Sequence, residues 1–213
     1  MSQPRLPSLY VICDTDVCRA AGWTPLDFAS ACLEGGARLL QIRSKGAPSG
    51  QLLDAVTAIL GLARSAGARV VVNDRADVAR MAGADGVHVG QTDLSPEAVR
   101  TVVGPDAIVG LSTHTSEQTD RAVGEPLSYI AVGPVFGTAT KATGYDAVGL
   151  ALVRYAAGRA ATRALPVVAI GGITVERARL VIDAGAQSVA VVTDLLVDND
   201  PAARVRRFLA ALA

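Results

Sequence analysis

The chain has 213 residues, of which 50% are hydrophobic and 4% aromatic, a composition that suits one domain with an aliphatic core. Lysine and arginine number 20 together, as do aspartate and glutamate, so the formal net charge is zero. This balance argues against a nucleic-acid partner or an anionic membrane partner, and any anion site must come from local placement of charge.

Short apolar runs alternate with amphipathic segments along the whole chain. Several runs are continuous, such as the three valines before Asn73 and the segment Val-Val-Ala-Ile before Gly171. Such runs are typical of strands that are buried on both faces of a parallel sheet. Strands are predicted at residues 8–13, 39–43, 69–73, 86–89, 108–111, 129–132, 166–170 and 188–192.

The segments between these runs carry helix signals. Thr24 and Ser95 each precede a proline, as an N-cap does, and Thr174 is placed to cap the helix after it. Helix ends are predicted at Gly35, Gly36, Gly67, Gly83 and Gly185. Eight such units favour an α/β fold in which residues 1–213 form a single (β/α)₈ TIM barrel, one catalytic domain; a doubly wound open sheet is the alternative.

The three cysteines, Cys13, Cys18 and Cys32, match no zinc-binding spacing. They are expected to be reduced thiols, as in a cytoplasmic protein. The chain shows no signal-peptide pattern and no apolar run long enough to span a membrane. The sequence does not specify the oligomeric state, and it is compatible with a homo-oligomer.

Polar residues end the second predicted strand in the segment Gln-Ile-Arg-Ser-Lys. Gln41 and Arg43 alternate with Ile42, so both side chains leave the strand on the same side. If that side is the barrel interior, Arg43 is a buried cation that needs an anion, because buried charges are usually paired. Lys45 lies in the following loop, where an ordinary exposed lysine is the alternative.

Two carboxylates follow the third and fourth predicted strands. Asp74 alone could merely cap the next helix, whereas Ser95 already supplies that cap beyond Asp93 and leaves Asp93 free. Mg²⁺ takes one or two protein carboxylates and completes its shell with phosphate oxygens and water. Asp74 and Asp93 together therefore predict a Mg²⁺ site.

The longest predicted loop spans residues 133–146. Thr138, Thr140 and Lys141 offer hydroxyl donors and a cation there, which suit phosphate or carboxylate oxygens, although the segment could be only a flexible loop.

A second anion site is predicted after the last two strands. Gly171-Gly172 follows the seventh strand and leads into a helix, and Val192-Thr193 follows the eighth. Barrels commonly bind phosphate at this corner, where a helix begins.

The chain has two histidines. His88 lies inside a predicted strand and is interpreted as structural. His114 lies beyond a strand end, close to Ser112, and is a candidate acid or base.

Six segments, taken in order, resemble the thiamine-phosphate synthase family: QIRSK, VVVND, GVHVGQTDL, GLSTHT, GPVFGTATK and AIGGIT. Each is weak alone, but six in register over nearly the whole chain are specific. The resemblance implies a transferase of thiamine biosynthesis that joins 4-amino-2-methyl-5-hydroxymethylpyrimidine diphosphate to 4-methyl-5-(2-phosphoethyl)thiazole, or its carboxylated form. Pyrophosphate would leave by a dissociative route.

The resemblance also implies site residues. The pyrimidine substrate would contact Gln41, Arg43, Lys45, Asn73, Ser112 and Lys141, of which Arg43, Lys45, Ser112 and Lys141 are the candidate catalytic residues. Mg²⁺ would be held by Asp74 and Asp93. The thiazole phosphate would contact Thr138, Thr140, Gly172, Val192 and Thr193.

One departure from the family pattern lies at the phosphate corner. The family usually has Ser-Ala after the last strand, and this chain has Thr193-Asp194. Thr193 keeps the hydroxyl, but a carboxylate beside a phosphate is unfavourable. Because successive residues leave a strand on opposite sides, Asp194 is expected to face the helix layer, where it meets a cation or backbone donor or caps the final turn.

Two other functions remain open. A thiazole tautomerase shares this fold and the phosphate corner, but it needs no diphosphate site, so the cluster of cations and carboxylates weighs against it. A non-catalytic phospholigand sensor would need the Gly171-Gly172 corner without the metal carboxylates.

Overall fold

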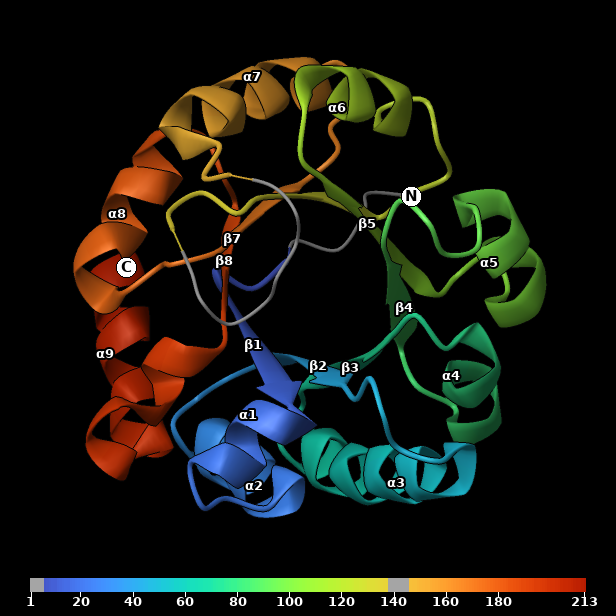
Figure 1. The fold of residues 1–213 in the computed structure, drawn as a ribbon, viewed down its shortest axis with the longest axis vertical. Coiled ribbons are helices and arrows are strands. Elements are labelled where there is room, and N and C mark those ends of the chain that lie inside the picture. Colours follow the sequence, from blue (N-terminus) through green and yellow to red (C-terminus); the bar gives the residue numbers. More distant parts are fainter. Residues whose placement is uncertain (1–5, 138–145) are drawn as a thin grey trace.

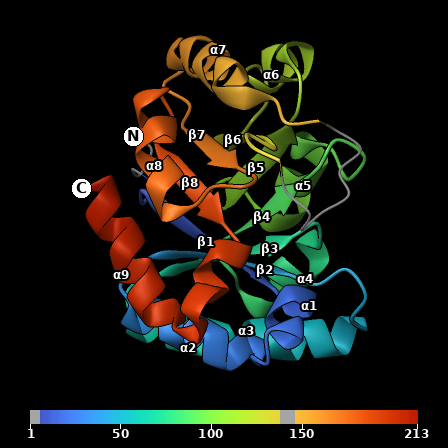
Figure 2. The ribbon, with the colours of Figure 1, turned by 60° about the vertical axis from the view of Figure 1, so that its left-hand side comes forward.

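Eight parallel strands close into a barrel in the computed structural model, which describes residues 6–137 and 146–213. Neighbouring strands pair in chain order, and β8 pairs with β1 to close the sheet. Helices surround the strands as an outer layer (Figures 1 and 2). The strands are β1 (Leu9–Asp14), β2 (Leu39–Arg43), β3 (Arg69–Asn73), β4 (Gly86–Val89), β5 (Ile108–Thr113), β6 (Tyr129–Val132), β7 (Val167–Ile170) and β8 (Ser188–Val191).

The helices alternate with the strands, with additions near the two ends of the chain. Both α1 (Thr15–Ala20) and α2 (Pro25–Glu34) follow β1, and a 3₁₀ segment, η1 (Thr193–Asn199), separates β8 from α9 (Pro201–Leu212). The remaining helices are α3 (Ser49–Ser65), α4 (Ala76–Ala82), α5 (Pro96–Val103), α6 (Ser116–Ala122), α7 (Gly149–Ala161) and α8 (Val175–Asp183).

The closed barrel predicted from the sequence is confirmed, and the open sheet is wrong. All eight predicted strands are present with boundaries that differ by one or two residues at most. The largest difference is at β5, which runs on to Thr113 because Ser112 and Thr113 continue to pair with β6.

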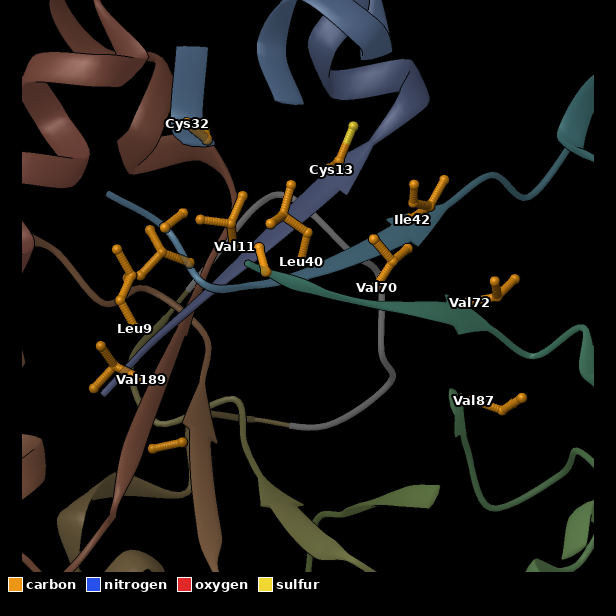
Figure 3. Packing of buried hydrophobic residues seen from close by; sticks show 14 of the residues in the cluster. Leu9, Val11, Cys13, Cys32, Leu40, Ile42, Val70, Val72, Val87 and Val189 are labelled. Atoms are coloured by element: carbon orange, nitrogen blue, oxygen red, sulfur yellow. The ribbon is translucent and has the colours of Figure 1, made fainter. Parts of the chain in front are cut away.

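The strands separate two hydrophobic cores. Val11, Leu40 and Val70 are register partners on β1, β2 and β3, and their side chains belong to the cluster packed against the helices (Figure 3). Residues of the opposite parity, such as Tyr10 and Val71, fill the barrel interior. Burying each aliphatic side chain contributes about 1.5–3 kcal/mol, so the alternation fixes which residues face inward.

Helix boundaries follow most of the predicted signals. The Oγ1 atom of Thr24 accepts the Asp27 N–H at 3.1 Å, and Oγ of Ser95 accepts the Ala98 N–H at 3.3 Å. Thr174 occupies the N-cap of α8 without a side-chain cap bond, so the predicted cap there is positional only.

The C-terminal helix packs against the start of the chain. A Cβ on Gly35 would lie 2.6 Å from the carbonyl oxygen of Ala202, so only glycine lets α9 approach α2 this closely. The indole N–H of Trp23 also donates to Oδ1 of Asn199 at 2.6 Å. The Trp23 bond joins the end of η1, the segment that carries Thr193, to the loop between α1 and α2.

Cys13, Cys18 and Cys32 are all buried thiols, and burial raises the pKa of Cys32 above its ordinary value. No helix in the described ranges combines the length and apolarity needed to cross a membrane.

Candidate active site

A cavity of about 730 Å³ opens where the carboxyl ends of the strands converge. Lys45, Asp74 and Asp93 are not among the described residues that line it. Thr138, Thr140 and Lys141, together with the rest of residues 138–145, lie outside the described residues. The predicted site residues in the lining are Gln41, Arg43, Asn73, Ser112, Gly172, Val192 and Thr193.

Arg43 forms an ion pair with Asp14 at the mouth of the cavity. The two are register partners at the ends of β1 and β2, and Nη1 of Arg43 donates to Oδ2 of Asp14. Oδ1 of Asp14 accepts the backbone N–H groups of Asp16 and Val17, each at 3.1 Å. The anion that Arg43 was expected to need is thus partly supplied by the protein. A guanidinium has five N–H donors, so others can still serve a substrate.

Lys45 and Asp74 form a second ion pair, with 2.6 Å between Nζ and Oδ2. Lys45 is exposed, and its ammonium group is paired with a carboxylate. Asp74 adopts a left-handed backbone conformation with φ of 62°, and its N–H donates to the His88 carbonyl oxygen at 2.8 Å. This conformation costs a non-glycine residue about 1–2 kcal/mol. Asp74 does not cap the next helix, because α4 has Arg75 at its N-cap and no side-chain cap bond.

Asp93 is exposed and closes the turn after β4, where its Oδ2 accepts the Gly90 N–H at 2.8 Å. Ser95 caps α5 as predicted, but Asp93 is not fully free, because one of its oxygens accepts this bond.

The donor set at the ends of β3 and β4 suits a hard cation. Within the described part of the chain, Oδ1 of Asp74 and Oδ1 of Asp93 carry no hydrogen bond. The described residues contain no cluster of three or more histidine, cysteine or acidic ligands. Two carboxylates are the number that Mg²⁺ commonly takes from a protein, since it usually keeps water and substrate phosphate in its shell.

The glycine turn after β7 is shaped by close packing. Gly171 and Gly172 have φ values of 102° and 62°. A Cβ on Gly171 would lie 2.5 Å from Cα of Pro134, and one on Gly172 would lie 2.7 Å from the carbonyl oxygen of Gly137. Only glycine therefore fits at both positions, and the backbone itself lines the cavity there.

Asp194, the departure from the expected pattern, is held by a cation. Nε and Nη2 of Arg204 donate to its Oδ2 at 3.0 and 2.8 Å. The expectation that a cation would hold Asp194 is confirmed, but the alternative role as a helix cap is wrong, because Asp200 caps α9. Asp194 still borders the cavity, with its charge balanced by Arg204.

Arg177 was not predicted from the sequence, and it also lines the cavity. Its guanidinium lies over the Phe136 ring, 4.8 Å from the ring centroid, and Nη1 donates to the Gly172 carbonyl oxygen at 3.0 Å. No carboxylate among the described residues pairs with it. Its signal in the sequence was its place in the first turn of the helix after Gly171-Gly172.

Sequence reasoning also missed two tyrosines inside the barrel. The hydroxyls of Tyr10 and Tyr129 lie 3.1 Å apart, and the Tyr129 hydroxyl lies 2.9 Å from Nδ1 of His88. Nε2 of His88 lies 2.8 Å from Oγ of Ser112. A buried tyrosine needs a partner for its hydroxyl, so two tyrosines in strands of an aromatic-poor chain were the available signal.

His114 also lines the cavity, and its Nδ1 lies 2.5 Å from the Gly133 carbonyl oxygen. A carbonyl oxygen can only accept, so Nδ1 carries a proton. His114 therefore stays a candidate acid or base whose Nδ1 is committed to the backbone.

Comparison with known proteins identifies relatives. The family model described as thiamine monophosphate synthase matches residues 9–195. A thiamine-phosphate synthase from Koribacter versatilis is 46% identical across 98% of this chain and 97% of its own length. One from Roseiflexus sp. strain RS-1 is 43% identical across 96% of this chain and 85% of its own length.

Solved structures agree with the sequence relatives. A thiamine phosphate pyrophosphorylase from Pyrococcus furiosus superposes with a TM-score of 0.85 at 29% identity, over 96% of this chain and 95% of that chain. A 3-hexulose-6-phosphate synthase superposes with a TM-score of 0.68 at 19% identity, over 97% of this chain and 100% of that chain, a likeness that shows the fold alone.

Proposed function

The chain belongs to the thiamine monophosphate synthase family, and we propose that it condenses 4-amino-2-methyl-5-hydroxymethylpyrimidine diphosphate with 4-methyl-5-(2-phosphoethyl)thiazole to give thiamine phosphate and pyrophosphate. The carboxylated form of the thiazole would give the same two products and carbon dioxide. One observation carries the proposal. Residues expected to bind the two substrates, Arg43 and Ser112 for one and Gly172 for the other, line a single cavity.

The diphosphate side of the cavity is built at the ends of β1, β2 and β3. Arg43 supplies a cation in the lining of the cavity, and Lys45 supplies one beyond the described lining, each already oriented by a carboxylate partner. Such preorganised donors stabilise negative charge with little reorganisation when a leaving group develops it. Lys141, which the family pattern assigns to the same substrate, would add a third cation.

Asp74 and Asp93 would hold Mg²⁺ in this proposal. The bound ion would offset the charge on the diphosphate oxygens. Asp74 is also the partner of Lys45, so the Lys45 ammonium group would lie beside the metal. Lys45 and the metal would then both offset the negative charge of the diphosphate.

The thiazole phosphate would lie at the corner formed by Gly171-Gly172, Val192 and Thr193, with Thr138 and Thr140 assigned to it by the family pattern. Arg177 supports this assignment with a cation that no described carboxylate neutralises. The charge of Asp194 is balanced by Arg204, so the corner keeps a net positive side chain.

The proposed reaction needs no protein nucleophile. The bond between the pyrimidine methylene carbon and the diphosphate oxygen breaks, and its electron pair leaves with pyrophosphate. The electron-rich aminopyrimidine stabilises the resulting cation. The thiazole nitrogen then donates its lone pair to that carbon and forms the new C–N bond. Positioning both substrates in one cavity supplies much of the acceleration.

A pyrophosphate-release assay tests the function. Release should require both substrates and Mg²⁺. Isomerisation of carboxylated thiazole phosphate without pyrophosphate release would identify a tautomerase, and equilibrium binding without turnover would identify a sensor. Both substrates are small molecules, and we expect the enzyme to act on them in the cytoplasm without a nucleic-acid or membrane partner.

A further inference from the structure

A continuous series of side-chain hydrogen bonds crosses the barrel interior, and Tyr10 and His88 within it line the cavity. It begins at Gln41, whose Nε2 lies 2.9 Å from the Tyr10 hydroxyl, and continues through Tyr129 and His88. It ends at Oγ of Ser112, 2.8 Å from Nε2 of His88. Both ends of the series, Gln41 and Ser112, line the cavity and are assigned to the pyrimidine substrate.

Gly110 makes room for this arrangement. It is the register partner of His88 on one side and of Tyr129 on the other. A Cβ on Gly110 would overlap the Tyr129 ring. Because Gly110 has no side chain, the His88 and Tyr129 rings stack across it, with centroids 5.6 Å apart and planes 13° from parallel. Tyr10 meets Tyr129 edge-on at 85°.

The partners of the two tyrosine hydroxyls bear on which group donates in each hydrogen bond of the series. Burial raises the pKa of both Tyr10 and Tyr129, so each phenol keeps its single proton at neutral pH. The Gln41 amide donates to Tyr10. The distance between the two phenols allows either to donate, and we take Tyr10 as the donor because Tyr129 is the one acceptor that the described residues offer to its proton. In that direction the Tyr129 proton goes to Nδ1 of His88. A neutral imidazole that accepts at Nδ1 carries its proton on Nε2.

We propose that Tyr10 and Tyr129 are positioning residues, which hold His88 as the Nε2–H tautomer so that the Ser112 hydroxyl is a donor toward the bound substrate. His88 then donates to Oγ of Ser112, and the Ser112 proton remains for an acceptor atom of the pyrimidine diphosphate. In the opposite tautomer, Ser112 would have to donate to His88 and could offer the substrate only lone pairs. The role in substrate binding rests on the proposed function, whereas the tautomer does not.

The two histidines make the tautomer measurable. Correlation spectra of ligand-free protein labelled with ¹⁵N-histidine should show two histidine rings. We expect the His88 ring to be protonated at Nε2 and the His114 ring at Nδ1, because the latter donates to the Gly133 carbonyl. Signals lost in His88→Asn assign the spectrum. A His88 ring protonated at Nδ1 in the wild-type protein would overturn the proposal.

A double-mutant cycle tests the consequence for Ser112. Tyr129→Phe should convert the His88 signals to an average of both tautomers and lower kcat about tenfold, the size expected for one lost hydrogen bond. In a Ser112→Ala background the same change should cost nothing further, because the hydroxyl it orients is gone. Tyr155→Phe removes an exposed hydroxyl bonded to Asp120 and serves as the control, with no change in either readout.

Equal losses in both backgrounds would show a merely structural role, and no loss in the wild-type background would show no role. If Tyr129→Phe does not fold, Tyr10→Phe replaces it, since it interrupts the same series one step earlier. The tautomer spectrum uses no substrate. A protein with the expected spectrum that releases no pyrophosphate would therefore disprove the proposed function without disproving the tautomer.

Discussion

Asp194 and Arg204 form an ion pair between η1 and α9, with side chains only 11% and 9% exposed. Two guanidinium nitrogens share Oδ2 of Asp194. The negative charge of Asp194, beside Thr193, is therefore balanced by Arg204 within the protein.

The pair is expected to serve stability rather than ligand binding. Asp194→Ala should lower the free energy of unfolding by about 3 kcal/mol, because it leaves Arg204 buried and unpaired. The double variant Asp194→Ala/Arg204→Ala removes the pair without a residual charge, and calorimetry at fixed pH and salt should find its affinity for thiazole phosphate unchanged. Substantially tighter binding by the double variant would mean that the phosphate feels the Asp194 charge.

Arg43 is expected to act on the leaving group. Arg43→Gln should lower kcat about 100-fold, the usual cost of removing one preorganised charge-stabilising donor. Its effect on the melting temperature should be small, because Asp14 keeps its two backbone donors. Arg38→Gln is the matched control, since Arg38 is exposed and precedes the opposite end of the same strand. Equal turnover by the two variants would show that Arg43 does not act on the leaving group.

Condensation should depend on Mg²⁺ through Asp74 and Asp93. Excess chelator should abolish turnover, and Asp74→Asn or Asp93→Asn should raise the Mg²⁺ concentration needed for half-maximal rate. Asp77→Asn should leave it unchanged, because Asp77 belongs to an exposed pair with Arg75. Full activity in chelator would rule out the metal site.

Arg177 is expected to bind the phosphate of the thiazole substrate. Arg177→Gln should raise KM for thiazole phosphate about tenfold, as expected when a charge-assisted hydrogen bond is lost, with KM for the pyrimidine diphosphate unchanged. Arg179→Gln, two residues along the same helix, removes an exposed guanidinium paired with Asp183 and provides the comparison. If both variants behave alike, Arg177 does not contact the phosphate.

The sequence predicted the barrel well because its main signals are local. Continuous apolar runs marked the strands, and capping residues marked most helix starts. Residues at strand ends converge in any barrel, so Arg43, Ser112 and Gly172 could be placed in one cavity before their contacts were known.

The contacts that were missed depend on register and on distant segments. Asp14 reaches Arg43 because β1 and β2 pair at that level, which no local pattern specifies. Arg204 reaches Asp194 only after η1 has turned the chain back. Tyr129 and His88 meet across Gly110, so their stacking required the alignment of three strands.

The stoichiometry of the complete reaction tests the central claim most directly. The purified protein is added to a mixture of pyrimidine diphosphate and thiazole phosphate in a buffer that contains Mg²⁺, and phosphorus NMR follows the substrates and products. We predict that thiamine phosphate and pyrophosphate form in equal amounts, and that neither forms when thiazole phosphate is omitted. Consumption of neither substrate, or thiazole conversion without pyrophosphate, would contradict the proposal that this chain is a thiamine-phosphate synthase.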